Sequence, residues 1–139
     1  MNQTKLEQII DVKLVRAWSK TLASSKIHSG GYDSLKLPSR GRTLIYLDPP
    51  YRDSFTNYST GFGDAEQIKL IQWYRDQVAK GHKVIESNRA EIGDTFFEDR
   101  LGDIADIHFL DVTYTAGRRK KTETGFEAKP AREVLIIYK

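Results

Sequence analysis

The chain of 139 residues is predicted to fold as an α/β protein with a mostly parallel sheet. Helix-like and strand-like segments alternate along it with short connections, which is typical of this class. Residues 43–47 form a continuous apolar run, as expected for a strand that is covered on both faces. With 39% hydrophobic residues and no Cys, the chain is expected to form its core without disulfides.

The N-terminal part is expected to be helical. Apolar side chains recur near helical spacing through residues 5–23, and no Gly or Pro interrupts them. Two Ser residues then break the pattern, and residues 26–33 are expected to hold a short strand. We expect a single domain over residues 1–139, in which residues 1–25 form a helical lead-in to the remaining portion, 26–139.

The strand at residues 43–47 is predicted to end abruptly at residues 48–51, which read Asp-Pro-Pro-Tyr. Two consecutive prolines are incompatible with a helix interior or a central strand, so the chain must leave the sheet there. After a loop rich in polar and aromatic residues, Asp64 is expected to cap a helix over residues 64–80. Residues 83–87 are predicted to form the next strand.

The C-terminal part is predicted to contain a short helix within residues 92–101 and two strands, at residues 106–115 and 134–138. The segment that links these two strands has no helical pattern, so the strands are expected to pair antiparallel. The predicted sheet is therefore mostly parallel, with an antiparallel strand pair at its C-terminal end.

Charge and hydropathy restrict the classes of function. A net charge of +3 allows a nucleic-acid partner without requiring one. The apolar runs are too short to span a bilayer, and the first residues lack the apolar core of a signal peptide. We expect a cytoplasmic protein of a bacterium or a phage-infected cell, without membrane contact. The three His residues show no metal-ligand spacing, so no metal is expected.

The most informative motif is Asp48-Pro49-Pro50-Tyr51, called segment 48–51 below. The prolines remove two backbone donors and leave carbonyl acceptors beside the Asp carboxylate and the Tyr ring. Acceptors next to an aromatic face suit a planar heterocycle that carries an exocyclic amino group. A rigid turn with an incidental aromatic residue is the alternative. Asn88, at the end of another predicted strand, is expected at the same edge of the sheet, where α/β proteins bind ligands.

Segment 48–51, after its apolar strand, resembles the catalytic signature of Dam-like DNA adenine-N6 methyltransferases, which are often phage-encoded. The resemblance covers residues 12–139 and continues through several motifs in order. These motifs are the helix and strand before the signature (Leu14-Val15 to Tyr32-Asp33), Phe55-Thr56-Asn57-Tyr58 with Gly61-Phe62, Val84-Ile85-Glu86-Ser87-Asn88, Arg118-Arg119-Lys120-Lys121, and Glu133-Val134-Leu135. The resemblance implies a partial Rossmann-like methyltransferase fold.

The resemblance also implies a reaction, in which S-adenosylmethionine donates a methyl group to N6 of an adenine flipped out of double-stranded DNA. Asp48 and the Pro49 carbonyl would hold the two N6 hydrogens, next to Pro50, while Tyr51 would stack on the base. Asp33 resembles an acidic position that helps to hold the cofactor, and Asp48 is also expected to contact the cofactor. Positioning would supply most of the rate, without a metal.

DNA contacts are predicted at three further places. Phe55 and Tyr58 could face the DNA or pack within their loop, and Asn88 could line the site or serve only as a turn former. Four cations could contact phosphates or form a solvated loop. They are Arg118, Arg119, Lys120 and Lys121.

One departure from the family pattern leaves alternatives open. The sequence contains no Phe-x-Gly-x-Gly motif, which normally cradles the methionine part of the cofactor, so the chain resembles a C-terminal catalytic half. It is then expected to need a partner chain that supplies the missing half. The alternatives are an inactive phage or prophage remnant, a nucleic-acid-binding module without catalysis, and a pocket for a free nucleotide.

Overall fold

The computed structural model describes residues 11–38, 42–52, 62–114, 120–122, 125–127 and 129–139. The chain divides into two compact units, Met1–Lys36 and Leu37–Lys139. Within the described residues, no helix combines the length and apolarity that crossing a membrane requires.

The first unit contains helix α1 (Val12–Ala23) and the short 3-10 helix η2 (Tyr32–Ser34). The side chain of Asp11 caps α1 by accepting a hydrogen bond from the backbone N–H of Leu14, at 3.0 Å. The predicted helix is confirmed from Val12 on, with Asp11 as its N-cap, and residues 5–10 of the predicted range lie outside the described residues. The strand expected at residues 26–33 is not formed. Gly30 adopts a φ of 125° there, which is not a strand conformation.

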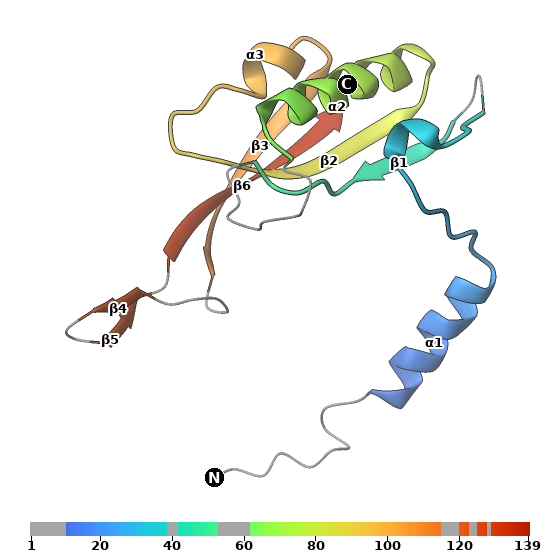
Figure 1. Ribbon diagram of the computed structural model, residues 1–139, viewed down its shortest axis with the longest axis horizontal. Helices are drawn as coiled ribbons and strands as arrows, with labels where there is room; N and C mark the ends of the chain where they lie inside the picture. The colour runs from blue at the N-terminus through green and yellow to red at the C-terminus, as the bar shows by residue number, and fades with distance from the viewer. Residues whose placement is uncertain (1–10, 39–41, 53–61, 115–119, 123–124, 128) are drawn as a thin grey trace. The chain divides into compact units, whose positions relative to one another are not determined.

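The second unit is built on a four-stranded sheet in the order β1-β2-β6-β3 (Figure 1). Its strands are β1 (Leu44–Leu47), β2 (Lys83–Ala90), β3 (Ala105–Tyr114) and β6 (Lys129–Tyr138). Among the described strands of this sheet, only β1 and β2 pair in parallel, so the prediction of a mostly parallel sheet was wrong. The reason is that β6 lies between β2 and β3 and runs antiparallel to both.

The predicted antiparallel pair at the C-terminal end is confirmed. Strand β3 pairs with β6 along its whole length, from Ala105 opposite Tyr138 to Tyr114 opposite Lys129. The segment between them forms a separate two-stranded sheet of β4 (Lys120–Thr122) and β5 (Gly125–Glu127), which the sequence did not predict.

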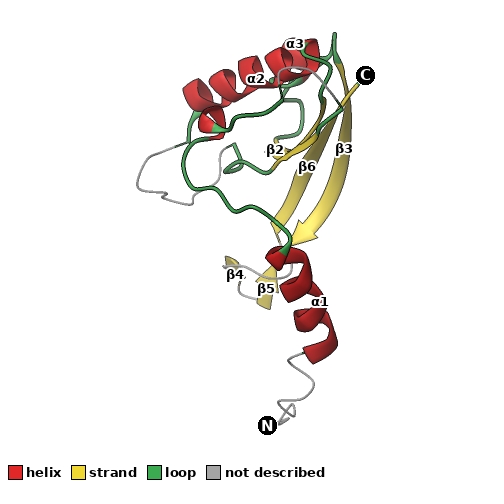
Figure 2. Ribbon diagram, turned by 90° about the vertical axis from the view of Figure 1, so that its right-hand side faces the viewer, coloured by secondary structure: helices red, strands yellow, loops and turns green. Residues whose placement is uncertain are grey.

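Helices α2 (Asp64–Ala79) and α3 (Glu98–Leu101) lie on the same face of the four-stranded sheet (Figure 2). Apolar side chains from both helices and from the sheet form the core between them. Its fully buried members include Leu70, Tyr74, Val84, Phe97, Leu101, Val134 and Ile136. The N-cap of α2 is Gly63 rather than the expected Asp64. Glu66 accepts a hydrogen bond from the Gly63 N–H, at 3.2 Å.

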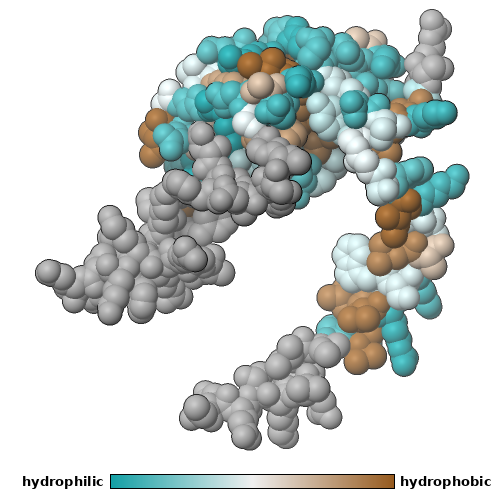
Figure 3. All heavy atoms as spheres, viewed as in Figure 1, coloured by the Kyte–Doolittle hydropathy of each residue, from teal (hydrophilic) through white to brown (hydrophobic). Residues whose placement is uncertain are grey.

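Strand β1 is the edge strand of the described sheet, next to β2 only. Leu44 and Tyr46 keep 64% and 61% of their surface exposed, and Leu47 alone is buried. The expectation that this strand is covered on both faces is therefore wrong for the described residues. The apolar side chains of helix α1 are also exposed (Figure 3).

Candidate active site

Segment 48–51 leaves the sheet at the C-terminal end of β1. Because β1 and β2 are parallel, with Leu47 opposite Glu86, the next residues of the two strands lie side by side. The Ser87 hydroxyl donates a hydrogen bond to Asp48 Oδ1, at 3.0 Å. The same Ser87 oxygen accepts a hydrogen bond from the Tyr46 hydroxyl, at 2.9 Å. The predicted meeting of the two strand ends is therefore found in the structure.

The Asp48 carboxylate is exposed and has no ion pair with a described residue. Its Oδ1 is oriented by Ser87, whereas no described residue donates to Oδ2. One oxygen of a fixed carboxylate can thus accept a hydrogen bond from a ligand. An amino or ammonium hydrogen is the partner that this geometry suits.

Tyr51 lies next to this carboxylate and is half-buried. Burial raises the pKa of its phenol, and the negative charges of Glu133 and Asp48 raise it further, against a smaller lowering by the hydrogen bond to Ser87. The ring therefore stays neutral across the physiological pH range. A neutral phenol beside a carboxylate offers an aromatic face on which a base can stack.

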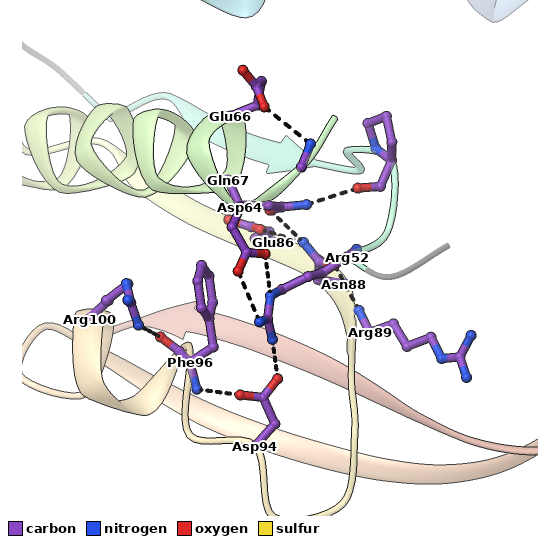
Figure 4. Close-up of polar contacts among 12 residues, drawn as sticks. Arg52, Asp64, Glu66, Gln67, Glu86, Asn88, Arg89, Asp94, Phe96 and Arg100 are labelled. Atoms are coloured by element: carbon purple, nitrogen blue, oxygen red, sulfur yellow. Dashed lines mark hydrogen bonds and ion pairs between the residues drawn. The ribbon is translucent and has the colours of Figure 1, made fainter. Parts of the chain in front are cut away.

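Behind segment 48–51, two buried amide side chains contact the backbone of this segment and of Arg52, which follows it (Figure 4). Gln67 of α2 donates from Nε2 to the Pro50 carbonyl, at 2.9 Å. Asn88 of β2 accepts at Oδ1 from the N–H of Arg52, also at 2.9 Å. Asn88 Nδ2 donates to Gln67 Oε1 at 3.1 Å and to Glu86 Oε1 at 3.0 Å. These contacts form one connected network of buried polar groups.

The side chain of Asn88 is buried, whereas a residue that contacts DNA has to be exposed. Its side chain is 0% exposed, and all its polar atoms have protein partners. The network also makes the two proline carbonyls different in their hydrogen bonding. The Pro50 carbonyl is engaged by Gln67, whereas no described residue donates to the Pro49 carbonyl.

Glu86 is an acid within the protein core that the sequence analysis did not single out. It is 0% exposed, and its Oε2 has no hydrogen-bond partner. Desolvation raises the pKa of its carboxyl from 4.5 to about 7, while the hydrogen bond from Asn88 lowers it by a smaller amount. An acidic residue within the apolar strand segment Val84-Ile85-Glu86 was the available signal.

Arg52, directly after segment 48–51, is a second residue that the sequence analysis missed. Its guanidinium forms ion pairs with Asp64, at the start of α2, and with Asp94, in the loop after β2 (Figure 4). It also lies over the Phe96 ring, 4.1 Å from the ring centre, as does the guanidinium of Arg100. Arg52 thereby ties the chain after the motif to two other elements. No local pattern reveals such partners.

The other predicted residues belong to other elements or lie outside the described residues. Asp33 lies exposed in η2 of the first unit, and Lys120 and Lys121 belong to β4. Phe55, Tyr58, Arg118 and Arg119 lie outside the described residues, so their predicted DNA contacts stay predictions. In the part of the chain that is described, no three His, Asp or Glu side chains cluster in a way that could hold a metal.

Comparison with known proteins places the chain in a family. The family model for D12 class N6 adenine-specific DNA methyltransferases matches residues 1–125. The chain is also similar to the type II methyltransferase M.MjaIII of Methanocaldococcus jannaschii, with 32% identity over 90 residues. That match includes 60% of this chain and 31% of the relative, so it spans less than a third of the relative's length. Because the family model covers most of the sequence, the chain belongs to the D12 class N6 adenine-specific DNA methyltransferase family.

Proposed function

We propose that this chain holds an adenine of double-stranded DNA for methylation at N6, with S-adenosylmethionine as methyl donor. The observation that carries the proposal is the Asp48 carboxylate at the end of β1, with one oxygen fixed by Ser87 and the other available beside Tyr51. Membership of the D12 family supports the same chemistry.

The chemistry requires that the adenine amino group be made nucleophilic. Its nitrogen lone pair is delocalised into the ring, and N6 cannot be approached in line while the base is stacked in the duplex. Asp48 Oδ2 and the Pro49 carbonyl accept the two N6 hydrogens, which favours a pyramidal nitrogen. Tyr51 stacks on the flipped base. When bound, S-adenosylmethionine would supply an electrophilic methyl group through cleavage of its S–CH3 bond, leaving S-adenosylhomocysteine. The N6 proton is released to Asp48 or to water.

The acidic side chains of the chain fit part of this cofactor. S-adenosylmethionine carries an ammonium group and ribose hydroxyls, which exposed carboxylates such as Asp33 and Asp48 can bind. The Phe-x-Gly-x-Gly turn of the family does not occur in the sequence. The proposal therefore includes a second polypeptide that supplies this turn.

The test is adenine methylation in cells whose DNA contains no N6-methyladenine. The chain is expressed alone and together with a polypeptide that carries the Phe-x-Gly-x-Gly turn, and genomic nucleosides are quantified by mass spectrometry. We expect N6-methyladenine with the wild-type chain and none with Asp48→Ala. If the wild-type chain yields none in either case, catalysis is refuted, and DNA retention by the purified chain then identifies a binding module.

A second prediction concerns Tyr51. Stacking of a base on an aromatic side chain contributes about 1–3 kcal/mol, so Tyr51→Ala is expected to lower kcat/KM about 5- to 150-fold. Tyr51→Phe keeps the ring and is expected to stay within about 3-fold of wild type. Steady-state transfer of a labelled methyl group to duplex DNA measures both. Equal losses in the two variants would show that the hydroxyl, and not the ring, matters.

A further inference from the structure

We infer that Gln67 and Asn88 are positioning residues, which hold segment 48–51 in one conformation before any substrate binds, and that Glu86 acts through Asn88. This inference rests on the proposed function of segment 48–51. It assigns a task to three side chains that touch neither the base nor the methyl group. Each belongs to a rigid element, α2 or β2, behind the site (Figure 4).

The two contacts with the backbone lie on either side of Tyr51, the stacking residue. Gln67 binds the Pro50 carbonyl, and Asn88 binds the N–H of Arg52. These groups belong to the peptide units on either side of Tyr51. Fixing both units fixes the direction in which the Cα–Cβ bond of Tyr51 leaves the backbone. The position of the ring is thereby determined from inside the protein.

The amide groups of the network can face only one way. The Pro50 carbonyl needs a donor, so Gln67 presents Nε2 to it and Oε1 to Asn88. Asn88 therefore presents Nδ2 to Gln67 and Oδ1 to the N–H groups of Arg52 and Arg89. Glu86 accepts a hydrogen bond from the second hydrogen of Asn88 Nδ2, so every polar atom of both amide side chains has a partner. A reversed amide at either position would set donor against donor or acceptor against acceptor.

Burial makes this arrangement costly to break. Gln67, Glu86 and Asn88 are each 0% exposed, so water cannot replace a lost partner. Leaving one buried donor or acceptor unpaired costs about 1–3 kcal/mol. The network is therefore a stable template and not an incidental set of contacts.

The network also selects which carbonyl the segment offers to a ligand. Because Gln67 draws the Pro50 carbonyl towards α2, that carbonyl is not available to an incoming amino group. The Pro49 carbonyl, which no described residue engages, remains as the backbone acceptor next to Asp48. Gln67 thus defines the pair of acceptors that reads an amino group with two hydrogens.

The experiment compares Gln67→Met with Gln72→Met. Both residues lie on α2, but Gln72 is exposed and its amide donates only within the helix, to Asp76. Amide hydrogen exchange of Arg52, followed by NMR, is expected to speed up at least about 10-fold in Gln67→Met and to stay unchanged in Gln72→Met. In the active enzyme, Gln67→Met is expected to lower kcat about 10- to 100-fold, with KM for DNA changed less than about 3-fold.

A measurement on the wild-type protein is informative even if Gln67→Met does not fold. The side-chain NH2 groups of Gln67 and Asn88 are expected to exchange with water at least about 10-fold more slowly than that of Gln72. Similar exchange rates for all three would overturn the inference, as would unchanged Arg52 exchange or an unchanged kcat in Gln67→Met. Slow exchange in a wild-type protein without methyl transfer would instead refute only the proposed function.

Discussion

Replacing Asp48 by Asn is expected to lower the rate of methyl transfer at least about 100-fold, the usual effect of removing one preorganised group at the reacting centre. Asn retains the size of the side chain and can still accept the Ser87 hydrogen bond that now reaches Oδ1. In place of Oδ2 it presents an NH2 group, which faces the N6 hydrogens donor to donor. Single-turnover transfer of a labelled methyl group to duplex DNA measures the rate without a contribution from product release.

The matched control for this prediction is Asp76→Asn. Asp76 is exposed on α2, and its carboxylate accepts from Gln72 of the same helix. This control removes the same charge from the protein and should leave the rate within about 2-fold of wild type. A near-normal rate in Asp48→Asn would show that another group holds the amine.

The second large effect concerns Glu86 and the stability of the fold. In the folded protein the pKa of Glu86 is raised to about 7 from 4.5, so the folded state binds more protons than the unfolded state between these values. The free energy of unfolding therefore falls as pH rises through this window and levels off above it. Between pH 5 and 8 the loss from this group is roughly 2 to 3 kcal/mol. The Glu86→Gln variant should not show this loss of stability, because Gln cannot ionise.

Urea unfolding of wild type and Glu86→Gln at pH 5, 6, 7 and 8 tests this prediction. The stability of the variant relative to wild type should increase with pH by that amount. Tyr74, whose pKa the negative charge of Glu86 helps to raise, stays neutral throughout. Asp64, Asp103 and Asp111 have lowered pKa values and titrate below this window in both proteins. If the free energies of unfolding of the two proteins change with pH in the same way, the prediction is wrong. Glu86 is then already ionised at pH 5, or it is hydrated.

Sequence reasoning succeeded where local chemistry dominates. Two prolines after an apolar run must end a strand, and this places the carboxylate of Asp48 at a sheet edge. The helix after the loop is confirmed within one residue of its expected bounds, since Gly81 ends it and apolar residues face the sheet. The antiparallel pair β3–β6 was also predicted, from the absence of a crossover helix.

Sequence reasoning failed where the partner of a residue lies far along the chain. The apolar run of β1 favoured a strand covered on both faces, yet Leu44 and Tyr46 are exposed in the described sheet. Asn88 was expected to contact DNA and line the site, or to serve only as a turn former, but its partners Gln67 and Glu86 hold it inside. Such pairings depend on which elements meet in space, and no spacing rule encodes them.

The sequence by itself determined the chemistry: a carboxylate, two carbonyls and an aromatic ring in consecutive positions can only be presented together, because covalent geometry keeps them adjacent. The tertiary structure alone decided how they are presented. Gln67 turns one carbonyl inward, and Ser87 fixes one carboxylate oxygen. Hydrogen bonds act over about 3 Å, so their partners are known only once α2 and β2 have packed behind the segment.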